Sequence, residues 1–386
     1  MLGANLQPGQ VLLISAELGQ VDAVRAVADA AYKRGAKFVD VAYFDPYLKR
    51  SRIQYAAEES LSYVPEWLGA ARVAHADGRG ARISLAGVTV PNLLAGLDPE
   101  RLGKDQLPRL KEGMKIIGER TTNWCIVPVP HPEWAKLVYP DLAPDDAYER
   151  LWTDVEHILR LDEPDPAASW LERMTVLNES ARKITEHRFD ALHLEGPGTD
   201  LTVGLFGSGT FWAADFSTVD GLTHYPNLPT EEVFTTPDPL RADGHVTSTK
   251  PLVLTDGTII RGLRVRFEGG RAVEITADEN GPALEARLRV DDGATRLGEL
   301  ALVDRQGRIG PLDTVFYDTL IDENAASHLA LGSGYAFVLE DEADRASSNV
   351  SATHVDFMIG SPQLEVTGIT KAGERVPVLR EGDWRI

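Results

Sequence analysis

The chain has 386 residues, of which 43% are hydrophobic and 25% are charged. This length exceeds what one ordinary hydrophobic core holds and predicts two domains of a globular protein. Acidic residues outnumber basic ones by 59 − 39 = 20, and a field of that sign repels phosphate backbones, which excludes nucleic acid as an expected partner.

The first half alternates predicted strands and helices. Strands are expected at 10–16, 37–44, 82–88 and 122–129, and helices at 22–35, about 54–66, near 107–119, about 144–160 and 166–186. Strands separated by helices predict right-handed crossovers and a mostly parallel sheet with flanking helices. We therefore expect an N-terminal α/β domain over residues 1–188.

The second half is richer in short strands separated by Gly, Pro and Asp turns. Strands are expected at 190–196, 199–206, 244–254, 262–270, 271–278 and 298–304, and short helices at about 282–289 and 323–330. Asp256-Gly257 is a typical hairpin turn. This pattern predicts a strand-rich α+β domain over residues 189–386, built on a mixed sheet or a partly closed barrel.

Targeting and cysteine usage indicate a cytoplasmic protein. The start of the chain has no basic segment ahead of an apolar stretch, and no uncharged apolar run approaches about 18 residues. We therefore expect neither secretion nor a membrane partner. The single cysteine, Cys125 in "WCIVPV", allows no internal disulfide and is predicted to be a buried thiol rather than a nucleophile.

Several common catalytic motifs are absent from the sequence. It has no HExxH, no GxSxG and no Walker loop, and the glycine turns "GPGTDL" and "GSGTFW" lack the dinucleotide fingerprint. The search for a site therefore turns to acids and histidines.

Two acidic segments of the second half are candidates. In "NLPTEEVFTTP" (227–237), Glu231 and Glu232 are adjacent, so on an extended chain only one of them faces a given pocket. In "RLGELALVDRQG" (296–307), Glu299 opens an apolar strand. Taken singly, a solvated acidic turn is the favoured explanation of the first segment, and Glu299 alone is a weak signal that a surface carboxylate explains.

Two histidine segments are more informative. In "DENAASHLALGSGY" (322–335), Asp322 and Glu323 suit a helix start and His328 a helix end, so capping explains this segment as well as a site does. In "SATHVDFMIGSP" (351–362), His354 and Asp356 project from the same face of a predicted strand. Such a pair is costly to bury unless it is bonded or binds a metal.

The four segments together predict a metal centre. They supply carboxylates from Glu232 (or Glu231), Glu299 and Asp356, and imidazoles from His328 and His354. This donor set suits zinc, cobalt or manganese. Three carboxylates fit two metals about 3.5–4 Å apart that share a carboxylate bridge, an arrangement that activates water for hydrolysis.

The same segments, in the same order, resemble the M29 metallo-aminopeptidases, the group of thermophilic aminopeptidases that includes aminopeptidases T and S. The N-terminal "QPGQVLLISA" and the later "GTDLTVGL" are also similar to this family, so the resemblance extends over nearly the whole chain. This chain differs from many members of the family at Ala326-Ser327, where those relatives have Ser-Cys.

The resemblance implies a dinuclear exopeptidase that acts on peptides with a free N-terminus. It implies five metal ligands (Glu232, Glu299, His328, His354 and Asp356), two divalent ions from among Zn, Co, Mn and Mg, and a homodimer. It also implies that Tyr335, in "GSGY", donates to the oxyanion. Glu231 is left as a candidate general base, with a supporting or solvated role equally open.

Two other functions remain open at this point. One is an amidase that uses the same metals on small amide substrates. The other is a metal- or peptide-binding protein without catalysis. Residues 189–386 are in every case the expected metal-binding domain.

Overall fold

The computed structural model describes residues 2–91, 93–94, 96–105, 107–108, 111–254 and 258–386. Its contacts divide the chain into two compact units: unit 1 holds residues 1–167 and 215–229, and unit 2 holds residues 168–214 and 230–386. This division of the chain differs from the one expected from the sequence, which has a single domain boundary near residue 188. Segment 215–229 belongs to unit 1 because the backbone N–H groups of Val219 and Tyr225 donate to Arg120 and Gly3.

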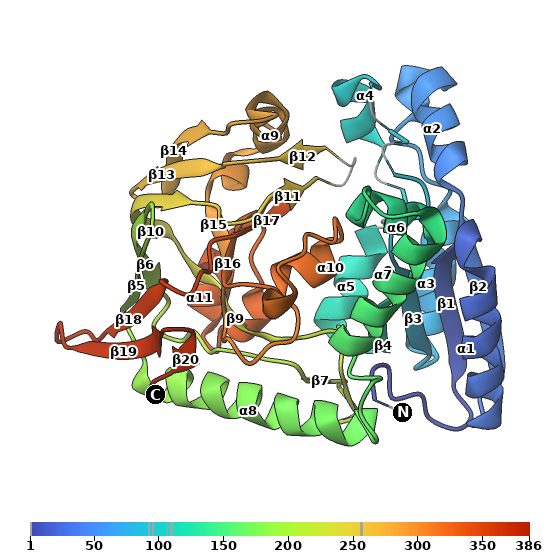
Figure 1. Cartoon of the computed structure of the whole chain (residues 1–386), viewed down its shortest axis with the longest axis horizontal. Helices are drawn as coiled ribbons and strands as arrows, with labels where there is room; N and C mark the ends of the chain where they lie inside the picture. Colours follow the sequence, from blue (N-terminus) through green and yellow to red (C-terminus); the bar gives the residue numbers. More distant parts are fainter. Residues whose placement is uncertain (1, 92, 95, 106, 109–110, 255–257) are drawn as a thin grey trace. The chain divides into compact units, whose positions relative to one another are not determined.

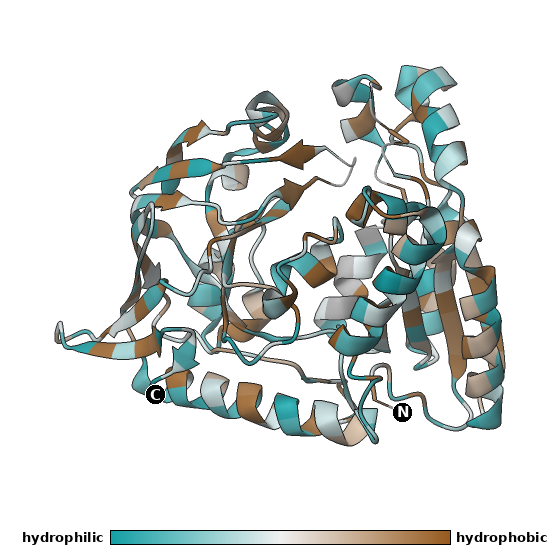
Figure 2. Ribbon diagram, viewed as in Figure 1, coloured by the Kyte–Doolittle hydropathy of each residue, from teal (hydrophilic) through white to brown (hydrophobic). Residues whose placement is uncertain are grey.

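Unit 1 is built on a parallel sheet, as predicted. The strands β1 (Val11–Glu17), β2 (Phe38–Phe44), β3 (Ala81–Ala86) and β4 (Asn123–Pro128) pair in the order β2-β1-β3-β4. Helix α1 (Val21–Lys33) packs against β1 and β2, where Leu12 and Ile14 meet Val24. Figure 2 shows the corresponding hydrophobic colouring along β1.

The helix predicted at about 54–66 is wrong. Helix α2 begins earlier, at Pro46, where Asp45 accepts a hydrogen bond from the Tyr47 N–H, and α3 begins only at Glu66, after Pro65. Prolines at or before a first turn favour these starts. The other elements of unit 1 are α2 (Pro46–Tyr55), α3 (Glu66–Asp77), α4 (Pro99–Lys104), α5 (Lys111–Glu119), α6 (Pro132–Val138), α7 (Pro144–Ile158), β7 (Phe216–Ser217) and β8 (Thr223–His224).

Unit 2 contains two larger antiparallel sheets, which confirms a strand-rich domain but not a mixed sheet or a barrel. The eight-stranded sheet runs β14 (Arg271–Thr276), β13 (Arg264–Glu268), β10 (Pro237–Thr247), β6 (Thr199–Leu205), β5 (Ala191–Gly196), β18 (Glu365–Ile369), β19 (Arg375–Arg380), β20 (Asp383–Trp384). The four-stranded sheet runs β17 (His354–Met358), β16 (His328–Gly332), β15 (Leu297–Val303), β9 (Glu232–Thr235).

The smaller elements of unit 2 include a short ladder and four helices. They are β11 (Leu252–Val253), β12 (Ile259–Ile260), α8 (Pro166–His187, of which Pro166 and Ala167 fall in unit 1), α9 (Gly281–Leu288), α10 (Thr319–Glu323) and α11 (Glu342–Ser347). The strand expected at 244–254 is therefore two strands, and the Asp256-Gly257 turn lies outside the described residues. Among the described helices, none combines the length and apolarity needed to cross a bilayer.

The helix predicted at about 323–330 is also wrong. Helix α10 ends at Glu323, and His328 is the first residue of β16. Every residue of β15 and β16 is buried, so these two strands form the interior of unit 2. A polar side chain on either strand therefore needs a partner.

Candidate metal centre

The four-stranded sheet brings all five predicted ligands together. Glu232 and His328 are the first residues of β9 and β16, Glu299 lies in β15, and His354 and Asp356 lie in β17. In the ladder, Glu299 pairs with Ala330 and Ala330 with Asp356. Directly paired residues share a face of a sheet, so this register places Glu299 and Asp356 on one side.

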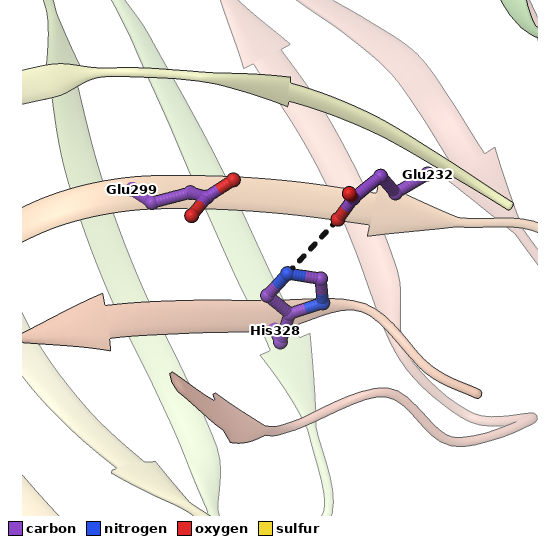
Figure 3. Close-up of side chains that lie close together, drawn as sticks. All are labelled: Glu232, Glu299 and His328. Atoms are coloured by element: carbon purple, nitrogen blue, oxygen red, sulfur yellow. Dashed lines mark ion pairs between the residues drawn. The ribbon is translucent and has the colours of Figure 1, made fainter. Parts of the chain in front are cut away.

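The ligand atoms form two overlapping groups. Glu232, Glu299 and His328 make one group, and Glu299, His354 and Asp356 make the other; within each group the potential ligand atoms lie within 4.8 Å of one another. Figure 3 shows the first group, with the carboxylates of Glu232 and Glu299 and the ring of His328 directed into one space. Glu299 belongs to both groups and is therefore suited to bridge two cations.

A bulge in β15 aims Glu299. The β15–β16 register shifts between Leu297 and Glu299, across Gly298, and such a bulge redirects the next side chain. A Cβ on Gly298 would lie 2.3 Å from the Gly332 carbonyl oxygen, and Gly332 itself has a φ of +110°. Only glycine fits both positions without strain.

Both imidazoles are held by their Nδ1 atoms. His354 Nδ1 donates to the Ser333 carbonyl at 2.8 Å, and His328 Nδ1 donates to the Ala326 carbonyl at 3.1 Å. Each Nε2 then faces carboxylates, at 3.1 Å from Glu232 for His328 and at 3.1 Å from Glu299 and Asp356 for His354. A histidine that binds a metal through Nε2 usually donates its Nδ1–H to a carbonyl in this way.

The electrostatics of the centre favour a cation. Burial raises the pKa of Glu299, whereas His354 lowers it. Burial lowers the pKa of His328, but Glu232, Glu299 and Asp356 raise it to about 10. Glu232 Oε2 is buried, and among the described residues its one polar contact is the ion pair with His328 Nε2 at 3.1 Å. The donor set and this buried oxygen fit divalent metal ions.

Tyr335 lies beside the second group. Its ring packs 5.7 Å from the Phe234 ring and 5.3 Å from the His354 ring, and its hydroxyl is 3.5 Å from His354 Nε2. Burial and the nearby carboxylates, Glu299 first among them, raise the pKa of the phenol well above its usual value. The hydroxyl is therefore a protonated donor at neutral pH.

Glu231 faces the opposite side of the chain from Glu232. Its carboxylate accepts from Arg173 Nε at 2.5 Å, and its side chain is fully buried. The alternation predicted from sequence is thus observed, and it directs Glu232 to the centre. An ion-paired carboxylate on the far side is poorly placed to act as the general base.

Comparison with known proteins shows the family. The model of the thermophilic metalloproteases (M29) matches residues 1–384. The chain belongs to the M29 peptidase family. It is 43% identical to aminopeptidase T of Thermus aquaticus, over 100% of this chain and 96% of that protein. It is 36% identical to aminopeptidase 2 of Geobacillus stearothermophilus, over 99% and 95%.

Solved structures agree with this M29 assignment. Wild-type AmpT from Thermus thermophilus matches with a TM-score of 0.92 at 40% identity, over 100% of this chain and 96% of that one. A 2,5-dihydroxypyridine dioxygenase from Pseudomonas putida has a TM-score of 0.51 at 12% identity, which indicates a shared fold alone. The resemblance drawn from the four sequence motifs is therefore confirmed.

Glu323, the last residue of α10, interacts electrostatically with the acids of this M29 centre, and the sequence pattern does not single it out. Burial raises its pKa well above the usual value, and the charges of Asp356 and Glu232 raise it further. The sequence contained one signal, an acid five residues before His328. From the sequence alone, a place in the first turn of a helix explains that acid, but the cap of α10 is Asp318, which accepts from the Ile321 N–H.

Proposed function

We propose that this protein is a metal-dependent aminopeptidase that removes N-terminal residues from peptides. The observation that supports this most directly is the pair of carboxylate–imidazole groups that share Glu299. Membership of a metalloprotease family and similarity to proteins named aminopeptidase T and aminopeptidase 2 support the same activity.

We assign one divalent ion to Glu232, Glu299 and His328, and a second to Glu299, His354 and Asp356. Zinc, cobalt, manganese and magnesium are the candidate ions for these oxygen and nitrogen donors. When bound, such ions acidify a water molecule and polarise a carbonyl group.

Tyr335 has the position and protonation of an oxyanion donor. Its hydroxyl lies next to His354, and its raised pKa keeps the proton on oxygen. A hydrogen bond from this hydroxyl would strengthen as negative charge develops on the scissile carbonyl oxygen, which lowers the barrier to attack.

Glu323 is the better candidate for moving a proton. Burial and the charges of Asp356 and Glu232 raise its pKa, so its carboxylate is a stronger base than that of an ordinary glutamate. We propose that it takes the proton from the attacking water and passes it to the leaving amine nitrogen. Glu231, which is bonded to Arg173, has a supporting role instead.

The test uses variants His354→Ala and Asp356→Ala with an amino-acid 4-nitroanilide as substrate. Both should abolish turnover after metal reconstitution and retain the wild-type circular dichroism spectrum. The matched control is His193→Ala, which removes another histidine of unit 2 that pairs with an aspartate, Asp200, at 2.9 Å. Undiminished turnover in both metal-replete centre variants would refute the proposal.

Blocked substrates separate the aminopeptidase from a general amidase. An aminopeptidase should cleave free-amine peptides and reject the same peptides after N-acetylation. Equal rates on both forms would favour an amidase on the same metals, and peptide binding without turnover would favour a non-catalytic binding protein.

Two finer features complete the proposal. We propose a homodimer on the basis of the family resemblance, which sedimentation velocity tests directly. We propose a cytoplasmic location because the sole cysteine, Cys125, is buried and free, which suits a reducing compartment.

A further inference from the structure

Behind the metal centre lies a buried ion-pair network centred on Arg173 of α8. Its Nε donates to Glu231 at 2.5 Å, and its two Nη atoms donate to the two oxygens of Asp304 at 2.9 and 2.8 Å. The three side chains are 4%, 0% and 1% exposed. The Trp384 indole N–H also donates to Asp304, at 2.6 Å.

Both acids of this network adjoin strands that carry candidate ligands. Glu231 immediately precedes Glu232 and β9, and Asp304 immediately follows β15. The two strands pair there, with Val303 opposite Glu232. One guanidinium therefore joins the start of β9, directly beside Glu232, to the end of β15, five residues beyond Glu299.

A second connection reaches the third ligand segment. The backbone N–H of Glu231 donates to Asn324 Oδ1 at 2.7 Å, and the Asn324 amide donates to the Leu320 carbonyl at 3.0 Å. Asn324 is 1% exposed, directly follows Glu323 and precedes His328 by four residues. The network is thus bonded to the segments on both sides of the Glu232–His328 pair.

Only arginine suits the centre of this network. Its planar fork makes a two-pronged contact with Asp304 while Nε remains free to reach Glu231, whereas a lysine ammonium is a single point charge. Removing the positive partner would leave two buried carboxylates uncompensated, which destabilises the folded protein.

We propose that Arg173 is a positioning residue for the metal site formed by Glu232, Glu299 and His328. It holds Glu232 in its inward orientation by fixing Glu231 on the opposite side of the same strand. The inference rests on the proposed metal-dependent function, and it predicts a selective effect on one of the two ion sites.

The experiment measures cobalt binding to metal-free protein by calorimetry and visible absorption. Arg173→Lys keeps the charge and loses the fork, and Arg173→Met loses both. We expect at least a tenfold loss of affinity for one equivalent in the lysine variant, a larger loss in the methionine variant, and near-wild-type affinity for the other equivalent. We expect kcat to fall with little change in KM.

Arg182→Met is the matched control. Arg182 lies on the same helix, in exposed ion pairs with Glu179 and Glu186, so its loss should change neither equivalent. Asn324→Ala leaves the Arg173 ion pairs in place and should also reduce the affinity for one cobalt equivalent. If Arg173→Met does not fold, this variant tests the proposal in its place.

Two results would overturn the inference. One is wild-type affinity for both equivalents in Arg173→Lys and Asn324→Ala. The other is an equal weakening of both equivalents with a lower Tm of the metal-free protein, which indicates a purely structural role. Failure of the wild-type protein to bind any cobalt would instead refute the proposed function itself.

Discussion

Tyr335 is positioned by packing rather than by a strand. It precedes the short helical turn at Ala336–Val338, and its backbone N–H donates to Thr236 Oγ1 at 2.7 Å. Contacts with the rings of Phe234 and Phe337 leave the hydroxyl directed at the carboxylate–histidine group. The chemistry assigned to this residue depends on that one oxygen atom.

Replacing Tyr335 by Phe should therefore lower kcat about 10²–10³-fold, because one preorganised donor to the oxyanion is lost. KM and metal affinity should change little, since the ring packing is kept. Steady-state kinetics on a dipeptide substrate with calorimetric metal binding would check this. An unchanged kcat would show that the hydroxyl does not act in the reaction.

The directions in which the adjacent acids Glu231 and Glu232 point are only partly predictable from the sequence. Strand alternation predicts that the two acids face opposite ways, and the structure agrees. The sequence alone does not show which one faces the metal centre, because the partner of Glu231, Arg173, is 58 positions away. Its spacing from Trp170 and Leu177 places Arg173 on the buried face of α8, but the sequence does not show which acids it meets.

At the scale of elements, strands that alternate with helices were predictable and β16 was not. The stretch Ala325–Leu331 is rich in alanine and leucine, which favour a helix. In the structure it pairs on both edges, with β15 and β17, and tertiary pairing overrides local propensity. The His354–Asp356 strand was predictable because it alternates clearly, with Val355 and Phe357 buried on its other face.

The glycine bulge in β15 leads to a prediction at this scale. Gly298→Ala should destabilise the protein by about 1–3 kcal/mol through overpacking and should also lower activity, because the bulge that aims Glu299 is disturbed. Thermal unfolding and nitroanilide turnover measure the two effects.

Gly118→Ala is the control for this change. Gly118 lies in α5, and no described side chain lies within 4 Å of an added Cβ, so alanine should be neutral or stabilise the helix by up to about 1 kcal/mol. Normal activity and stability in Gly298→Ala would show that the bulge does not need glycine.

At the scale of the whole molecule, the candidate centre lies in unit 2, although that unit is discontinuous in sequence. The sequence predicts two domains divided near residue 188, with the candidate ligands in the second. It did not predict that residues 215–229 return to unit 1, because the hydrogen bonds that hold them there link segments about 100 to 220 positions apart.

Because the centre concentrates buried acids, metal ions should stabilise unit 2. Free metal at 100 times its Kd adds about 2.7 kcal/mol to the free energy of unfolding, and a chelator should reverse the resulting rise in Tm. Without a cation, His328 holds a proton up to a pKa of about 10, and that proton must leave on binding. Apparent metal affinity should therefore rise with pH between 6 and 8.

Differential scanning calorimetry across this pH range, with and without cobalt, provides the measurement. Glu299→Gln is the comparison variant, because it removes the charge shared by both ligand groups and nearly preserves the shape. An equal metal-induced rise in Tm in this variant, or an affinity that falls with increasing pH, would contradict the assignment.

The position of Glu299 between two ligand groups also limits how the centre can be redesigned. With two ions bound as proposed, replacing Glu299 cannot give a one-ion enzyme, because that change removes a ligand from both groups at once. The alternative is to replace the side chains of Glu232 and His328 together, or those of His354 and Asp356 together. Each pair of replacements leaves the other candidate group with Glu299 in place, so metal binding and turnover can be measured for each group separately.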